Sequence, residues 1–354
     1  MIHTLIGDPD TLQTLRGRSA TFMLAMSNTA TADIPGITQA GIPGMIHLTP
    51  VLDGEFIATG EVRSLPNVAE TPKGVPTPAL ITRAVHLLRP FGRIELLDLG
   101  LRVQPQGEDL TVHRFGIPPS GDIAQGARID ARAVFEAGRR FGQEYALQDE
   151  YLILGESVPS GTTTATAAAL GLGYDAARLF SSSFRDVPDS IRDETIAQAL
   201  EQTRGRTDLF EILGSVADNM LIFNAGFVLG ADGRFPIVLA GGTQMAAVLL
   251  VANRIIAEQG HPREVPLQDT VLWTTKWVAE DAHSDIRALL AMLDFPIDAY
   301  YADFDFGLSK HPALALYDQG EAKEGVGAGG ALTYGILNSL SPEAITRQVE
   351  GFLG

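Results

Sequence analysis

The sequence has 354 residues, of which 45% are hydrophobic and 19% are charged, enough for one large globular domain or two modest ones. The formal net charge of −17 argues against a nucleic-acid or anionic-membrane partner, because both surfaces would repel the chain. Cysteine is absent, which excludes disulfides, thiolate metal sites and cysteine nucleophiles and fits a cytoplasmic protein.

Neither the N-terminal segment nor the one long uncharged run of the sequence indicates a membrane protein. Asp8 and Arg16 stand near the N-terminus, where a signal peptide would be apolar. The uncharged run 235–252 is long enough to span a bilayer, but Pro236 and the Gly241-Gly242 break divide it. This run favours a buried strand at 237–240, a glycine turn, and a helix over 244–258. We therefore expect a soluble, cytoplasmic protein.

Taken in chain order, apolar runs and amphipathic segments alternate. Strands are predicted at 20–26, 94–99, 151–154, 237–240, 270–274 and 299–304, and helices at 10–15, 78–88, 131–145, 164–172, 189–203, 208–229, 244–258 and 284–293. Two stretches rich in Gly, Pro and Thr, 27–50 and 65–78, are too long for simple turns and are typical of functional loops.

This alternation predicts an α/β fold with a mainly parallel, Rossmann-like sheet flanked by helices and with ligands bound at the carboxyl ends of the strands. We expect residues 19–335 to form the nucleotide-binding and catalytic domain. The terminal segments 1–18 and 336–354 are predicted to form a small helical accessory part.

The stretch 151–174 is the most informative part of the chain. A short strand leads through a turn rich in Gly, Ser and Thr into an Ala-rich helix, which directs backbone N–H groups and the positive end of the helix dipole at one spot. Such a turn suits a phosphate group. Glu156 would repel a phosphate unless it faces a sugar hydroxyl. The alternative is an ordinary strand–turn–helix with a Ser/Thr cap and no ligand, since neither the Walker pattern nor GxGxxG is present.

A second candidate is the glycine-rich stretch 321–330. Its glycines would let the backbone approach a flat ligand closely, and Glu324 stands just before them as a candidate base. Composition alone favours a flexible, charged surface loop instead.

Together these stretches carry a resemblance to a known family. The motifs GESVPSGTTT (155–164), LAGGTQMAA (239–247) and KEGVGAGGA (323–331), in this order, resemble the nicotinate-nucleotide:dimethylbenzimidazole phosphoribosyltransferases of cobalamin lower-ligand assembly. GVPTPALITRAVHLL (74–88), DLGLRVQP (98–105) and SSSFRDVP (181–188) look like the divergent, largely archaeal branch of that family. The resemblance covers most of the chain.

The resemblance implies transfer of ribose 5-phosphate from nicotinate mononucleotide to a nitrogen of an aromatic base, with Glu324 as the catalytic base. The chain departs from the bacterial Gly-x-Gly-Asn turn after Glu156, and its base-pocket segment matches the family only through Thr77-Pro78 and Thr82. The acceptor, dimethylbenzimidazole-like or a purine, therefore stays open. The implied phosphate and ribose contacts are Glu156, Ser157, Ser160, Gly161, Thr162, Thr163, Arg192, Gly241 and Gly242. The implied contacts to the base are Thr77, Thr82, Gly325 and Gly327.

Neither a cofactor nor a metal is expected. Asp98 lacks the acidic neighbour with which a diphosphate-donor transferase would hold Mg²⁺, and the acidic residues around His283 are more typical of a helix start than of a metal site. The family further implies a homodimer. Two other functions are compatible with parts of the sequence: a non-catalytic nucleotide- or ribosyl-phosphate-binding protein, and a dinucleotide dehydrogenase, which the missing GxGxxG disfavours.

Overall fold

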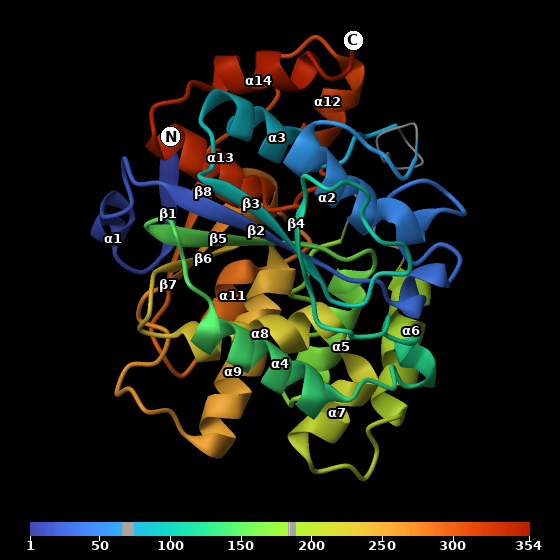
Figure 1. Ribbon diagram of the computed structural model, residues 1–354. Coiled ribbons are helices and arrows are strands. Elements are labelled where there is room, and N and C mark those ends of the chain that lie inside the picture. Colours follow the sequence, from blue (N-terminus) through green and yellow to red (C-terminus); the bar gives the residue numbers. More distant parts are fainter. Residues whose placement is uncertain (66–73, 183, 185–188) are drawn as a thin grey trace.

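An eight-stranded sheet forms the centre of the computed structural model, which describes residues 1–65, 74–182, 184 and 189–354 (Figure 1). The strand order is β1-β8-β7-β6-β5-β2-β3-β4, and all neighbouring pairs are parallel except β1 with β8. The strands are β1 (Ile2–Ile6), β2 (Ala20–Met26), β3 (Arg93–Asp98), β4 (Thr111–Arg114), β5 (Tyr151–Ser157), β6 (Ile237–Ala240), β7 (Thr270–Thr275) and β8 (Asp298–Ala302).

Helices cover both faces of this sheet. They are α1 (Pro9–Gln13), α2 (Thr49–Thr59), α3 (Ala79–Leu88), α4 (Ala131–Glu144), α5 (Gly161–Gly171), α6 (Asp189–Glu201), α7 (Leu209–Val216), α8 (Asn219–Ala231), α9 (Thr243–Gln259), α10 (Lys276–Ala279), α11 (Ile286–Leu290), α12 (Pro312–Asp318), α13 (Ala328–Leu337) and α14 (Pro342–Glu350). Short 3₁₀ turns lie at η1 (Ala30–Asp33), η2 (Ile46–Leu48) and η3 (Ile123–Gln125).

The strands are apolar on both sides because each face of the sheet is buried. In β2, Phe22 and Leu24 pack into one core with helices α3 and α13, whereas Met23 and Ala25 pack into another with α4, α8 and α9. Figure 1 shows the two layers, with α2, α3, α13 and α14 on one side and α4, α5, α7, α8 and α9 on the other. A continuous hydrophobic run is the expected pattern for such a strand.

The strand order reverses beside β2. That strand pairs with β3 on one side and with β5 on the other, and the register places Met26 opposite both Asp98 and Ser157. The carboxyl ends of these strands therefore meet at one edge. In open α/β sheets, a crevice at such a switch point is the usual ligand site.

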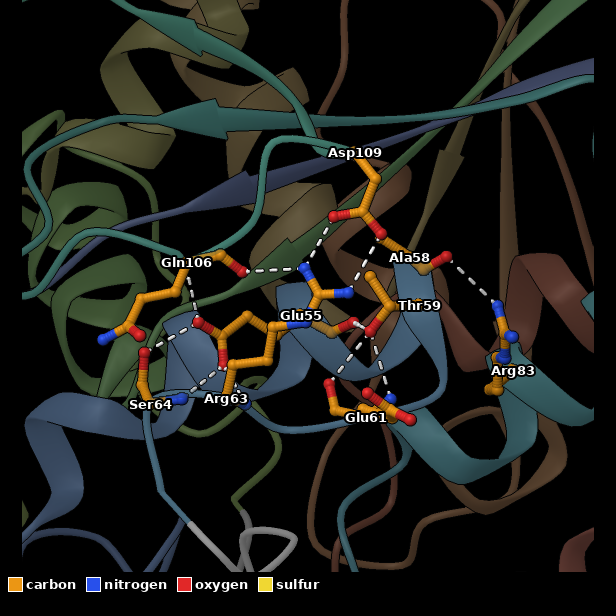
Figure 2. A network of polar contacts seen from close by, with 9 residues as sticks. All are labelled: Glu55, Ala58, Thr59, Glu61, Arg63, Ser64, Arg83, Gln106 and Asp109. Carbon is orange, nitrogen blue, oxygen red and sulfur yellow. Dashed lines mark hydrogen bonds and ion pairs between the residues drawn. The ribbon is translucent and has the colours of Figure 1, made fainter.

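A buried carboxylate fixes α2 at this edge. Glu55 accepts hydrogen bonds from the N–H of Arg63 (2.7 Å), the N–H and hydroxyl of Ser64 (2.9 and 2.7 Å) and the N–H of Gln106 (2.8 Å) (Figure 2). Arg63 also forms an ion pair with Asp109 at 2.6 Å. These bonds join the end of α2 to the turn that follows β3, so α2 keeps its place beside the switch point.

The predicted fold class is confirmed, and so are the six predicted strands, though β5 extends through Ser157 and α5 begins at Gly161 rather than at 164. The uncharged run 235–252 forms β6, a glycine turn and the start of α9, as predicted. Throughout the described ranges, no helix combines the length and the apolar character needed to cross a membrane. Parts of the predicted loop 65–78 and of the motif at 181–188 lie outside the described residues.

One predicted helix, 208–229, is wrong as a single element. Ala217 is extended (φ −96°, ψ −179°), and the Asp218 side chain accepts a hydrogen bond from the N–H of Leu221 to begin α8. Apolar periodicity runs through the break, because α7 and α8 both bury most of their residues. The hydrophobic pattern therefore predicts one continuous helix, and it does not indicate that Asp218 caps a second one.

The N-terminal segment also differs from the prediction. A strand, β1, precedes the expected helix and pairs antiparallel with β8, so that residues 2–6 extend the sheet rather than belong to a helical part. The helix α1 and the C-terminal α14 lie where helical segments were expected. The domain limits at 19 and 335 stay a prediction.

Candidate active site

A pocket at the carboxyl edge of the sheet brings the two glutamate motifs together. Segments 156–162, 242–244 and 322–326 line it, and the empty volume is about 900 Å³, open to solvent. Residues 38, 40 and 41 of the Gly/Pro-rich loop 27–50 add to the wall. Of the implied site residues, the wall includes Thr77, Glu156, Ser157, Ser160, Gly161, Thr162, Gly242, Glu324 and Gly325.

The turn between β5 and α5 is strained and polar. Ser160 precedes the helix with a left-handed backbone (φ 66°, ψ 9°), a conformation that costs a non-glycine residue roughly 1–2 kcal/mol. Its side chain is 6% exposed, and its hydroxyl has no hydrogen-bond partner in the described part of the chain. A strained residue with an unused hydroxyl, at a helix N-terminus, is typical of a ligand site.

Helix α9 begins beside α5. A Cβ atom added at Gly161 would lie 1.8 Å from Oε1 of Gln244, so the glutamine amide rests against the first residue of α5. Oε1 of Gln244 has no partner among the described residues, while Nε2 lies 3.4 Å from Oε1 of Glu156. At the start of α5 the N–H groups of Gly161 and Thr163 already donate to the carbonyl oxygens of Val158 and Ser160, both at 2.9 Å, which leaves the N–H of Thr162. The positive ends of the α5 and α9 dipoles both lie beside this part of the pocket.

The Glu324 carboxylate lies at the N-terminus of α13. Oε1 accepts from the N–H groups of Gly325 (3.2 Å) and Gly329 (3.0 Å). Oε2 accepts from the N–H of Thr275 (3.0 Å) and the hydroxyl of Thr274 (3.3 Å). The side chain is therefore held in one orientation. The surface-loop alternative is wrong, because this stretch is packed into the pocket wall.

Left-handed residues shape the loop around Glu324. Ala322 (φ 49°) and Val326 (φ 54°) are non-glycine residues in this region, and Gly325 (φ 134°) and Gly327 (φ 69°) share it. Backbone strain of this kind persists where the surrounding structure fixes it, and it gathers at functional sites.

Two of the implied base contacts stand behind the wall. Thr82 donates its hydroxyl hydrogen bond to the carbonyl oxygen of Val326 at 2.8 Å. Gly327 packs so closely on Gly155 that a Cβ at Gly155 would lie 3.1 Å from the Cα of Gly327. In this structure both residues support the loop that carries Glu324.

Three further implied contacts, Thr163, Arg192 and Gly241, do not line the pocket either. Arg192, on α6, is 8% exposed and donates to the Thr166 hydroxyl at 2.7 Å. The same hydroxyl donates to the carbonyl oxygen of Thr162 at 2.7 Å. Arg192 therefore touches the second turn of α5, one turn away from the pocket.

Burial changes the charge of the two glutamates. It raises the pKa of Glu156 to about 8, with the nearby Glu324 carboxylate as the next cause. It raises the pKa of Glu324 to about 7, against the opposing effect of its N–H and hydroxyl donors. Near pH 7, Glu156 is mainly protonated and neutral. It can donate a hydrogen bond to a sugar hydroxyl without repelling a neighbouring phosphate.

A third acid in the pocket, Asp53 on α2, was not among the site residues predicted from the sequence. Its two oxygens accept from the hydroxyls of Thr77 and Ser157, both at 2.7 Å, and so join the implied base contact to the end of β5. Burial raises the pKa of Asp53 to about 6. A helix at this place could have been predicted from Thr49-Pro50, because proline favours the first turn. The role of Asp53 depends on long-range contacts.

The acidic residues near His283 form local caps, as predicted. Asp285 begins α11 by accepting from the N–H of Ala288 at 2.9 Å. Asp281 accepts from the N–H of His283 at 3.1 Å and pairs with Lys323 at 3.1 Å.

Comparisons with known proteins agree with this fold. A UPF0284 protein from Sulfurisphaera tokodaii is 37% identical to this chain over 93% of the chain and 91% of its own length. A UPF0284 protein from Archaeoglobus fulgidus is 37% identical over 97% of the chain and 96% of its own length. A scan against protein-family models found no match.

Solved structures show the same relationship at the level of the fold. The nicotinate-nucleotide-dimethylbenzimidazole phosphoribosyltransferase from Thermus thermophilus covers 94% of this chain at 19% identity, with a TM-score of 0.56 and 83% of its own chain matched. A second structure, CobT from the same organism, gives a TM-score of 0.58 with 84% of its chain matched. The resemblance seen in the motifs is thus confirmed in the fold, and the chain belongs to the UPF0284 family.

Proposed function

We propose that this protein is a phosphoribosyltransferase that moves ribose 5-phosphate from nicotinate mononucleotide to a ring nitrogen of an aromatic base. The observation that carries the proposal is the meeting of Glu156 and Glu324 in one pocket beside the starts of α5 and α9. The CobT-like fold supports it.

The polar groups of the pocket suit the donor. A phosphate at the start of α5 would receive the N–H of Thr162, the Ser160 hydroxyl, which has no partner among the described residues, and the positive end of the helix dipole. Protonated Glu156 would then donate to a ribose hydroxyl, and the free Oε1 of Gln244 would accept from one.

The reaction needs little acid catalysis. The bond between C1′ and the pyridinium nitrogen breaks, and its electron pair leaves with nicotinate, whose ring nitrogen becomes neutral. A nitrogen lone pair of the acceptor forms the new bond to C1′ from the opposite face, which gives the α-ribosyl phosphate. The alkylated ring is then a cation, and the proton on its other ring nitrogen must be removed to restore a neutral base, which is work for a general base.

Glu324 is suited to accept that proton. Its pKa of about 7 lies near the pH of the reaction, where a general base works best. The longest of its four hydrogen bonds comes from the Thr274 hydroxyl, which can turn and accept once the carboxylate is protonated. The N–H groups keep the carboxylate oriented throughout.

The acceptor would lie toward Thr77 and Gly325. Pro76, Pro78 and Val326 make this side partly apolar, while Asp53 and Thr77 supply polar atoms. A dimethylbenzimidazole-like base and a purine both fit this description, so both belong in the assay.

The test is a product assay. Protein is incubated with nicotinate mononucleotide and a panel of benzimidazoles and purines, and nicotinate and the α-ribosyl phosphate are measured by chromatography with mass detection. We expect stoichiometric release of both products with at least one base. Binding of nicotinate mononucleotide without release of nicotinate for any base would instead establish the non-catalytic binding protein.

A further inference from the structure

Lys323, which directly precedes Glu324, is a buried cation in the wall of the candidate active site. It is 4% exposed, and its Nζ lies 3.1 Å from Oδ2 of Asp281 and 3.4 Å from the carbonyl oxygen of Phe184. Its own carbonyl oxygen accepts from the Thr275 hydroxyl at 2.6 Å, so the backbone that carries it is fixed.

The ammonium group has one donor more than its partners use. A lysine carries three N–H donors, and within the described ranges those of Lys323 reach two acceptors, Asp281 and Phe184. One N–H donor therefore has no acceptor among the described residues. Among the described residues that line the candidate active site, Lys323 is also the only lysine or arginine.

Asp281 holds this lysine in place. Its side chain is 3% exposed and accepts from the Ser284 hydroxyl at 2.8 Å as well as pairing with Lys323. A buried ion pair with further hydrogen bonds keeps its geometry, and losing one partner would leave an uncompensated charge. Asp281 is thus a positioning residue for the ammonium group.

Lys323 stands between two cavities, and their charges differ. The neighbouring cavity is lined by Glu280, Asp305 and Asp318, with Lys276 already paired to acidic residues. An anion is not expected there. On the other side, the starts of α5 and α9 present N–H groups to the candidate active site, so an anion near Lys323 would meet favourable groups from several elements.

We propose that Lys323 binds an anionic group of the donor, either its phosphate or its pyridine carboxylate, with Asp281 fixing the position of the ammonium group. This inference rests on the proposed function, because it takes nicotinate mononucleotide as the donor. Both anions belong to that molecule, and an experiment with partial donors can tell them apart.

The test uses three ligands and a variant without the ion pair. Lys323→Met alone would leave the buried Asp281 carboxylate without its ion-pair partner. The double variant K323M/D281N is therefore compared with wild type. Lys276→Met is the matched control, because this lysine is also ion-paired but lines only the neighbouring cavity and not the candidate active site. Calorimetry measures the affinity of nicotinate mononucleotide, of nicotinamide mononucleotide, which lacks the carboxylate, and of nicotinate riboside, which lacks the phosphate.

A charge-assisted contact should contribute roughly 10- to 100-fold in affinity. If Lys323 binds the carboxylate, the double variant loses this factor for nicotinate mononucleotide and nicotinate riboside and keeps its affinity for nicotinamide mononucleotide. If it binds the phosphate, both mononucleotides lose the factor and the riboside does not.

An equal loss for all three ligands, or none, would overturn the inference while leaving the proposed function standing. Failure of wild type to bind any of them would overturn the proposed function, and this inference with it. Lys276→Met should match wild type throughout.

Discussion

The N–H of Val326 donates a hydrogen bond of 2.8 Å to the carbonyl oxygen of Glu156. This bond joins the two glutamate motifs directly, two residues after Glu324, and the close packing of Gly327 on Gly155 supports it. A displacement of either segment is therefore transmitted to the other. The relative position of the two acids depends on backbone contacts more than on the side chains themselves.

Replacing Glu324 by Gln should abolish most of the turnover. The amide keeps the size of the side chain but cannot take the proton, so we expect kcat to fall by about 10²–10⁴-fold with little change in donor affinity. Wild-type activity should decline below about pH 7, where the carboxylate becomes protonated, and the residual activity of the variant should lack this decline.

Four donors face Glu324, so its amide variant needs a stability control. Thermal unfolding separates a misfolded protein from an inactive one. Glu280→Gln, in the neighbouring cavity, should retain full activity. An unchanged rate and pH profile in folded Glu324→Gln would refute the role of this residue as general base.

Replacing Glu156 by Gln should change how stability depends on pH. The pKa of this carboxyl rises from 4.5 to about 8 on folding, so between these values the folded chain binds more protons than the unfolded chain. The stabilisation that the Glu156 carboxyl contributes to the folded state is therefore fully present below about pH 4.5 and is lost as the pH rises through about 8. The free energy of unfolding falls by at most about 1.4 kcal/mol per pH unit over this range.

The Glu156→Gln variant should escape this loss. Urea unfolding at pH 5 and at pH 8.5 should show a smaller decrease in the free energy of unfolding than in wild type, whereas Glu264→Gln, at an exposed position, should behave like wild type. Parallel pH dependence in wild type and Glu156→Gln would contradict a raised pKa at this site.

Gly161→Val should weaken donor binding at least tenfold without unfolding the chain. The first new atom would meet the end of the Gln244 side chain, which is flexible enough to move. The displaced amide and the added methyl groups would then occupy the space expected for the phosphate. Titration with nicotinate mononucleotide measures the loss, and Gly171→Ala, at the far end of α5, is the control. A donor affinity equal to that of wild type would place the phosphate elsewhere.

Activity should not require a divalent metal. Asp98, at the carboxyl end of β3, already accepts hydrogen bonds from the N–H groups of Gly100 and Leu101 and from Gln104, and it acts as a turn-forming residue. Turnover should be the same in EDTA as in buffer supplemented with Mg²⁺. Loss of activity in EDTA that Mg²⁺ restores would revive a diphosphate donor.

The fold could be predicted largely because buried parallel strands leave a strong pattern. β2 is a continuous apolar run. β6 and α9 are separated by the turn Gly241-Gly242, which can be recognised in the sequence. Breaks made by a single buried side chain are harder to see. Asp218 divides α7 from α8 through one cap, inside an otherwise uniform apolar pattern.

The residues of the candidate site that could be predicted are those that stand within a contiguous sequence motif. Glu156 and Glu324 each stand within such a motif. Asp53 lies outside these motifs, and its place in the site depends on a distant partner, Ser157. Lys323 begins the motif at 323–331, but its ion pair with Asp281 joins segments that are not adjacent in the sequence. The same reason explains why Thr82 was expected in contact with the base, whereas it holds the loop from behind.

The antiparallel strand β1 has a practical consequence for handling the protein. It covers the outer edge of β8, where residues 2–6 pair with 299–302, and the carbonyl oxygen of Met1 accepts from the N–H of Asp303. A truncated chain that begins after residue 7 would expose that edge, with Tyr300 and Tyr301 on it. Unpaired strand edges pair with one another, so such a chain should self-associate more than the chain that retains β1, which light scattering would measure.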